Sequence, residues 1–202
     1  MILMRSDPVM VGASKFERED FDAYFTIDPM CIEALCTSVR IPPGDILEPA
    51  AGRGHLVSEL RMRNRSVVAR DLVKHENPLV DDIAAGHNIL DMKSLIGFGA
   101  LITNLPYQTQ DKLLEHILPI AARDKCMVAI LTRAAWPIAQ RRSDLVHHNK
   151  NFHGIVHLPR RPWWSEVRTS SPRHDFVWCI WDAEPRQSER ATLYYPGVEV
   201  HA

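Results

Sequence analysis

The stretch Ile46-Leu47-Glu48-Pro49-Ala50-Ala51-Gly52-Arg53-Gly54-His55-Leu56 carries the strongest fold signal in this chain. It begins as a short apolar strand, turns through two glycines, and continues into a segment with helical periodicity at Leu56 and Leu60. Glycine permits positive φ and lets a ligand approach the backbone without a Cβ in the way. A helix that starts directly after the turn presents free N–H groups and the positive end of its dipole. The stretch therefore predicts a cradle for a nucleotide-like ligand.

The segments around this turn alternate between strands and helices. An apolar strand at 67–71 ends in Asp71, about 20 residues beyond Gly52, the spacing expected of a carboxylate that binds ribose hydroxyls. Further strands are expected at 99–103, 127–131, 154–158 and 176–181, and helices at 30–39 and 110–122. This alternation predicts an α/β fold built on parallel strands.

The glycine turn departs from two common phosphate-binding patterns. A dinucleotide turn would place a third glycine where this chain has Val57, and no Gly-Lys-Ser/Thr of a P-loop follows. Glu48 stands just before the turn, where an acid would repel a pyrophosphate and attract a cationic aminoacyl group. The pattern therefore disfavours a dehydrogenase.

The bulk composition is that of an ordinary globular protein. The 202 residues are 46% hydrophobic, and 24 Lys and Arg against 25 Asp and Glu give no global argument for nucleic acid. We expect one domain over residues 1–202, with 1–23 as a flexible arm and 184–202 as a weakly structured tail. The four cysteines lack metal-ligand spacing, which favours buried thiols in a reducing compartment and no metal site. No apolar run approaches the ~20 residues of a membrane helix, so we expect a cytoplasmic protein without a membrane partner.

A second marked stretch, Leu101-Ile102-Thr103-Asn104-Leu105-Pro106-Tyr107, ends another expected strand. Because the carboxyl ends of parallel strands converge on one crevice, this stretch should face the glycine turn. A ring-conjugated amino group is a poor nucleophile, and hydrogen bonds to the side-chain carbonyl of Asn104 and to a backbone carbonyl would align its lone pair. Pro106 fixes φ and donates no hydrogen bond, and Tyr107 offers a face on which a base can stack. The stretch predicts the place where a substrate amino group reacts.

Both stretches resemble motifs of one family. Residues 48–54 resemble the D/E-P-x-x-G-x-G motif of class I S-adenosylmethionine-dependent methyltransferases. Residues 104–107 resemble the (D/N/S)-P-P-(Y/F) motif of the amino-methylating branch, which includes adenine-N6 DNA methyltransferases. Residues 24–29 are similar to the Y-x-T-P segment before the first helix, and the similarity is greatest to small phage- and prophage-type enzymes. Leu105 departs from the usual proline and matches the form used by ribosomal RNA adenine-N6 dimethyltransferases.

The resemblance implies a Rossmann-like fold with a mostly parallel seven-stranded sheet, helices on both faces, and S-adenosyl-L-methionine as cofactor. The residues that it assigns to the cofactor are Thr26, Glu48, Pro49, Ala50, Gly52, Gly54, Asp71, Asn88 and Asp91. Among them Asn88 replaces the acid that contacts the adenine in the family, and Asp91 is placed to substitute for it. The residues that it assigns to methyl transfer are Asn104, Pro106 and Tyr107.

The substrate signal lies between Arg133 and Arg173, where basic residues outnumber acidic ones and tryptophans interleave with them. Such a pattern suits the backbone and the bases of nucleic acid, although it is also compatible with a solvated loop and core tryptophans. The candidate substrate-binding residues are Arg133, Arg161, Trp163, Trp164 and Arg168. We expect a monomer or homodimer that methylates adenine N6 in DNA, with DNA favoured over RNA. The alternatives are an RNA adenine-N6 methyltransferase, a protein glutamine-amide methyltransferase, and a catalytically inactive nucleic-acid-binding relative.

Overall fold

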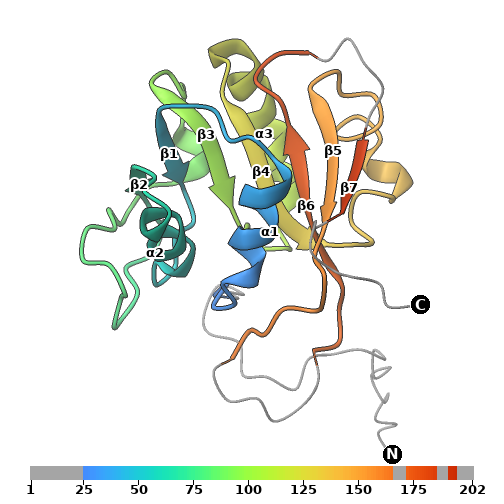
Figure 1. Cartoon of the computed structure of the whole chain (residues 1–202). Coiled ribbons are helices and arrows are strands. Elements are labelled where there is room, and N and C mark those ends of the chain that lie inside the picture. The colour runs from blue at the N-terminus through green and yellow to red at the C-terminus, as the bar shows by residue number, and fades with distance from the viewer. Residues whose placement is uncertain (1–24, 166–171, 186–190, 195–202) are drawn as a thin grey trace, which may run out of the picture.

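The computed structural model describes residues 25–165, 172–185 and 191–194 (Figure 1). The strands are β1 (Asp45–Glu48), β2 (Val67–Ala69), β3 (Phe98–Thr103), β4 (Met127–Arg133), β5 (Phe152–His157), β6 (Phe176–Trp181) and β7 (Ala191–Tyr194). The helices are α1 (Met30–Ser38), α2 (His55–Met62) and α3 (Gln110–Asp124), with short 3₁₀ turns η1 (Ile89–Asp91) and η2 (Gln140–Arg142).

The strands form one sheet in the order β2-β1-β3-β4-β6-β5-β7. The pairs β2–β1, β1–β3, β3–β4 and β5–β7 are parallel, whereas β6 runs antiparallel to both β4 and β5. The prediction of an α/β fold with a mostly parallel sheet is therefore confirmed. The strand β7 lies within residues 184–202, which we expected to form a weakly structured tail, so that expectation is wrong for Ala191–Tyr194.

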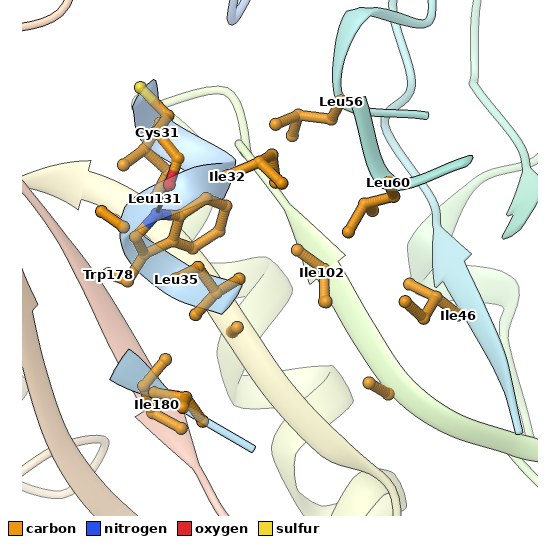
Figure 2. Close-up of a cluster of buried hydrophobic side chains, with 14 of the residues drawn as sticks. Cys31, Ile32, Leu35, Ile46, Leu56, Leu60, Ile102, Leu131, Trp178 and Ile180 are labelled. Carbon is orange, nitrogen blue, oxygen red and sulfur yellow. Dashed lines mark hydrogen bonds between the residues drawn. The ribbon is translucent and has the colours of Figure 1, made fainter. Parts of the chain in front are cut away.

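Helices cover both faces of the sheet, as predicted. On one face α1 and α2 pack against Ile46, Ile102 and Leu131 (Figures 1 and 2). On the other face α3 and η1 pack against side chains that alternate with these along the same strands. The Trp178 indole N–H donates a 2.7 Å hydrogen bond to the carbonyl oxygen of Cys31, which fastens α1 to β6 (Figure 2).

The carboxyl ends of β1, β2, β3 and β4 meet at one edge of the sheet, the lower edge as drawn in Figure 1. The glycine turn follows β1, Asp71 lies just beyond β2, and the stretch 104–107 follows β3. The topology thus brings together the segments singled out in the sequence. No helix in the described ranges is both long and apolar enough to cross a membrane.

Candidate active site

A cavity of about 300 Å³ opens at this edge of the sheet. Predicted site residues that line it are Thr26, Pro49, Ala50, Gly52, Asp71, Asn88, Asn104, Pro106 and Tyr107. Three further predicted residues, Glu48, Gly54 and Asp91, do not line it. One cavity therefore contains most of the residues assigned to the cofactor together with those assigned to methyl transfer.

The glycine turn forms the floor of the cavity. Gly52 has φ +56°, and a Cβ at this position would lie 2.7 Å from the Phe25 ring. Gly54 has φ +89° and precedes α2, and a Cβ there would lie 2.5 Å from the Val80 side chain. Both glycines are thus required by backbone conformation and by close packing. Gly54 serves the packing of the turn rather than the cavity wall.

Asp71 joins the turn to the end of β2. Its Oδ2 accepts a 2.7 Å hydrogen bond from the Gly52 N–H, and its Oδ1 accepts one of 2.8 Å from the Val73 N–H. His75 Nε2 lies 3.6 Å from the same Oδ1. A carboxylate offers about four lone-pair sites, so these contacts leave acceptor capacity for ribose hydroxyls at the cavity wall.

Glu48 lies outside the cavity. Its side chain is completely buried, and the Ala50 N–H donates a 3.4 Å hydrogen bond to Oε1. Burial raises the pKa of Glu48 to about 8, although the Thr103 hydroxyl and the Ala50 N–H oppose the rise. The carboxyl is therefore mainly protonated at neutral pH. In the protein without a bound cation Glu48 is therefore neutral and does not line the cavity, so its attraction for an aminoacyl cation stays a prediction.

Asn88 lines two cavities, and Asp91 lines only the second of them. The Asn88 side-chain oxygen accepts a 3.0 Å hydrogen bond from the Leu90 N–H and so caps η1 at the cavity wall. Asn88 also lines a second cavity of about 210 Å³, together with Asp91, Arg70 and His87. Asp91 therefore lies beside Asn88 in the second cavity and does not line the first.

The stretch after β3 is held in a defined conformation. The Asn104 Nδ2 donates a 3.0 Å hydrogen bond to the Thr26 hydroxyl oxygen, and Thr26 is only 5% exposed. The carbonyl oxygen of Pro106 accepts a 3.1 Å hydrogen bond from the Thr109 N–H, which closes a turn before α3. Thr26, assigned to the cofactor by the sequence motif, is therefore also a partner of the predicted catalytic amide.

Aromatic and basic side chains surround Tyr107. The Arg133 guanidinium carbon lies 5.5 Å from the centroid of the Tyr107 ring. The Phe176 ring lies 6.1 Å from Tyr107 and 4.7 Å from Trp164, measured between centroids. Two predicted substrate residues, Arg133 and Trp164, thus lie near the cavity. Phe176 was expected only as part of a strand, since its sequence neighbours do not reveal which ring it contacts.

The loop that carries the two tryptophans is anchored at the start of α1. Arg160 donates two hydrogen bonds to the Asp28 carboxylate, of 2.6 and 3.1 Å, and the Trp163 N–H donates a third of 3.1 Å. Burial by itself would raise the pKa of Asp28, but the hydrogen bonds from Arg160 and Trp163 outweigh it and lower the pKa. The Arg160 side chain is therefore held by Asp28 and stabilises the position of this loop.

A cluster of positive charge lies beside this loop. Arg161 forms a 2.8 Å ion pair with the exposed Asp175. The pKa of His174 is lowered, first by burial and then by the charges of Arg133, Arg161 and Arg173. Of these arginines, Arg133 is the one that also lies against the Tyr107 ring. Arg168, the remaining candidate for substrate binding, lies outside the described residues.

Several cavity residues were not identified from the sequence. They are Phe25, His55, Leu72, His75, His87, Ile89, Lys112 and Leu113. The Phe25 ring stacks on His55 at 5.8 Å, meets His75 edge-on at 5.4 Å, and lies under the Arg53 guanidinium at 4.9 Å. Its position beside Thr26 in the motif is the one sequence signal that pointed to it. No cluster of three His, Cys, Asp or Glu side chains suited to a metal ion occurs in the described part of the chain.

Comparisons with known proteins find the same architecture in solved structures. The sequence matches no family model and no curated protein. Among solved structures, a Listeria monocytogenes protein described as a class I S-adenosylmethionine-dependent methyltransferase matches with TM-score 0.50 and 14% identity. The match covers 82% of this chain and 62% of that longer chain. The 1,6-didemethyltoxoflavin-N1-methyltransferase of Burkholderia thailandensis, solved with S-adenosylhomocysteine, matches with TM-score 0.51 and 13% identity over 76% of this chain and 78% of that chain. The chain therefore has the fold of class I S-adenosylmethionine-dependent methyltransferases.

Proposed function

We propose that the protein is an S-adenosylmethionine-dependent methyltransferase that methylates the exocyclic N6 amino group of adenine in DNA. One observation carries the proposal: Asn104 lies on the wall of the same cavity as Gly52 and Asp71. The residues that would bind a nucleoside and the hydrogen-bond acceptor for a substrate amino group therefore line the same cavity.

The residues of the cavity fit this cofactor. A Cβ at Gly52 would collide with the Phe25 ring, which lines the same cavity, so only glycine keeps this part of the cavity wall as it is. Asp71 supplies carboxylate oxygens for the two ribose hydroxyls. Leu72, Ile89 and Leu113 supply an apolar wall for the adenine. Thr26 and the backbone of the turn also line the cavity, and we assign them to the methionine end of the cofactor.

The bound cofactor would supply an electrophilic methyl group on a sulfonium. The protein positions the substrate nitrogen that receives the methyl group. We assign one N–H of the substrate amino group to Asn104 Oδ1 and the other to the Leu105 carbonyl oxygen, because the Pro106 carbonyl already accepts from Thr109. These hydrogen bonds favour a pyramidal nitrogen and direct its lone pair into the cavity. The amino proton released after transfer leaves to solvent, since the neutral amine is the stable form of the product.

The surroundings of Tyr107 support nucleic acid as the substrate. Arg133, Arg161 and Arg173 lie near enough to His174 to act on its charge, and such basic side chains suit phosphates, although Arg161 is paired with Asp175. Tyr107 and Trp164 offer rings on which an extruded base can stack. A base in a duplex cannot reach such a cavity unless it leaves the stack.

The deciding experiment measures methyl transfer to defined polymers. The purified protein is incubated with labelled S-adenosylmethionine and unmethylated DNA, and the DNA is digested to nucleosides. We expect labelled N6-methyladenine, and none from Asn104→Ala, whose cofactor affinity should be retained. Cofactor binding without labelled adenine would contradict the assignment to DNA.

Leu105 favours RNA as the second candidate substrate, because the Asn-Leu-Pro-Tyr form occurs in the resembling ribosomal RNA enzymes. Parallel reactions with unmodified RNA and with a glutamine-containing protein substrate separate these activities from the DNA activity. An inactive nucleic-acid-binding relative would bind DNA equally well with Asn104→Ala and would label none of the polymers.

A further inference from the structure

Ile138 is a large apolar side chain with 72% of its surface exposed. It lies in the segment that joins β4 to η2, and this segment leaves the sheet at the edge where the cavity opens (Figure 1). The two residues before it, Trp136 and Pro137, are buried, whereas the chain presents Ile138 to solvent. A single exposed apolar residue is common on protein surfaces, so its surroundings decide what it can do.

Two successive turns keep Ile138 close to the end of β4. The Trp136 N–H donates a 2.8 Å hydrogen bond to the Arg133 carbonyl oxygen, and the Ala139 N–H donates one of 3.4 Å to the Trp136 carbonyl oxygen. The Cα atoms at the two ends of such a turn are less than about 7 Å apart, so Ala139 lies within about 14 Å of Arg133. The Arg133 guanidinium in turn contacts the Tyr107 ring. Ile138 therefore lies on the same side of the cavity as the ring on which a base can stack.

The segment that carries Ile138 is fastened to the wall of the cavity. The Trp136 indole N–H donates a 2.8 Å hydrogen bond to Asp111 Oδ1, and Arg142 Nε donates to both carboxylate oxygens of Asp111, at 2.9 and 3.0 Å. Asp111 lies in the first turn of α3, directly before Lys112, which lines the cavity. Ile138 is thus presented by a rigid support whose position relative to the cavity is fixed.

Basic side chains accompany Ile138. Arg141 is 73% exposed, and its Nε lies 3.6 Å from Asp111 Oδ2. One carboxylate cannot neutralise two guanidinium groups, so the cluster formed by Asp111, Arg141 and Arg142 keeps a positive charge. The one acidic residue within the segment 134–151 is Asp144, which forms an ion pair with His148 when the histidine is protonated. An exposed apolar side chain beside positive charge suits a nucleic-acid duplex, whose stacked bases are flanked by phosphates.

We infer that Ile138 inserts into the base stack of duplex DNA and fills the gap that the extruded adenine leaves. An extruded base leaves an empty space between its neighbours, and apolar side chains such as isoleucine can occupy the space between base steps. The inference rests on the proposed function and goes beyond it, because Ile138 belongs to none of the motifs and does not line the cavity. Ile138 stabilises the extruded state and does not contact the reacting atoms.

The first test measures binding and needs neither methyl transfer nor a known target sequence. Fluorescence anisotropy compares an intact DNA duplex with the same duplex containing one abasic site, in which the gap already exists. The wild-type protein should bind the abasic duplex about 10-fold more tightly, because Ile138 enters the gap without the cost of unstacking a base. Ile138→Ala should lose most of this preference, and Ile138→Leu should retain it. Ile96→Ala is the matched control, since Ile96 is 78% exposed but precedes β3 at the opposite edge of the sheet.

The results that contradict the inference are also defined. A wild-type protein without preference for the abasic duplex would overturn it. So would an Ile138→Ala variant that keeps the preference, or one that loses affinity equally for both duplexes, because the side chain would then only touch the outer surface of the DNA.

The second test measures methyl transfer to the duplex and to one of its strands alone. Ile138→Ala should lower kcat/KM on the duplex by about 10-fold and leave the rate on the single strand nearly unchanged, because a single strand has no paired stack to fill. An equal loss on both substrates would refute insertion. If the wild-type protein methylates none of the polymers, the proposed function fails. The preference for the abasic duplex then decides the inference by itself, as it also does if the single strand is not methylated.

Discussion

Arg160 donates two hydrogen bonds to the carboxylate of Asp28 across 132 positions of sequence. The carboxylate is 6% exposed and the guanidinium 49%, so the pair lies half in the protein and half in solvent. It holds the tryptophan-bearing loop against the segment that contains Thr26. The geometry of the candidate site therefore depends on a contact between Asp28, which lies in the 24–29 motif, and Arg160, which lies outside all of the motifs.

Asp28→Asn should destabilise the protein by about 2 kcal/mol, because hydrogen bonds to charged groups contribute roughly 1.5–3 kcal/mol. The matched control is Glu184→Gln, which breaks the Lys125–Glu184 pair. Both pairs have a shortest N–O distance of 2.6 Å, but Glu184 is 64% exposed and should contribute almost nothing. Urea unfolding of the two variants measures the difference, and equal losses would refute this account of Asp28.

The buried Glu48 should make stability depend on pH in an unusual direction. Its pKa in the folded protein is about 8, against an ordinary value of 4.5. Between these values the folded state holds a proton that the unfolded state has released, so the free energy of unfolding falls as pH rises. This contribution is fully present below pH 4.5 and is lost as pH approaches 8.

Glu48→Gln removes this dependence, because glutamine keeps the shape and the neutral state of the protonated acid. We expect the variant to become more stable than the wild type by up to about 1.4 kcal/mol per pH unit above pH 4.5. Denaturant titrations at pH 5, 6, 7 and 8 measure the slope. Parallel curves for the two proteins would show that Glu48 is charged in the fold.

Gly52→Ala should abolish cofactor binding as well as destabilise the fold. The positive φ of +56° costs an alanine about 1–2 kcal/mol, and the new Cβ would collide with Phe25 at the cavity floor. Gly97→Ala is the control, since Gly97 also has positive φ but its Cβ would meet no atom within 4 Å. We expect a similar backbone cost in both variants and a loss of S-adenosylhomocysteine affinity, by calorimetry, only in Gly52→Ala. Retained affinity would place the cofactor elsewhere.

The positive cluster near Tyr107 should contribute to DNA affinity through phosphates. Replacing Arg133 or Arg173 by Gln should weaken binding and reduce the slope of log K against log salt by about 0.9 for each phosphate that the variant no longer neutralises. Arg40→Gln is the control, because Arg40 is exposed at the opposite edge of the sheet, before β1. Fluorescence anisotropy at several salt concentrations gives the slopes. An unchanged slope for both cluster variants would exclude this surface from DNA binding.

The parts of the fold that the sequence predicts correctly depend on neighbours in the chain. Strand and helix periodicity gave the core strands and the three helices within a few residues of their observed ends. The parallel topology placed Gly52, Asp71 and Asn104 at one edge, and the cavity contains all three. These features follow from local backbone geometry and from the rule that parallel strands present their carboxyl ends together.

The strand β7 was missed because a strand of four residues is too short to show a periodicity of its own, and pairing with β5 stabilises it. The position of Asp91 also depends on the fold. It is the last residue of the one-turn η1, and it lines the second cavity but not the first, which its place in the sequence does not reveal.

The sequence by itself determined the α/β architecture, the glycine turn and the order of the motifs, because each of these is encoded in residues that are adjacent along the chain. Only the tertiary structure decided that Glu48 is neutral, that Arg160 is committed to Asp28, and that Thr26 faces the Asn104 amide. Burial and long-range hydrogen bonds exist only once distant segments have packed together. From the sequence alone, a carboxyl group can only be given its ordinary pKa. Its environment in the folded protein sets its actual pKa and charge.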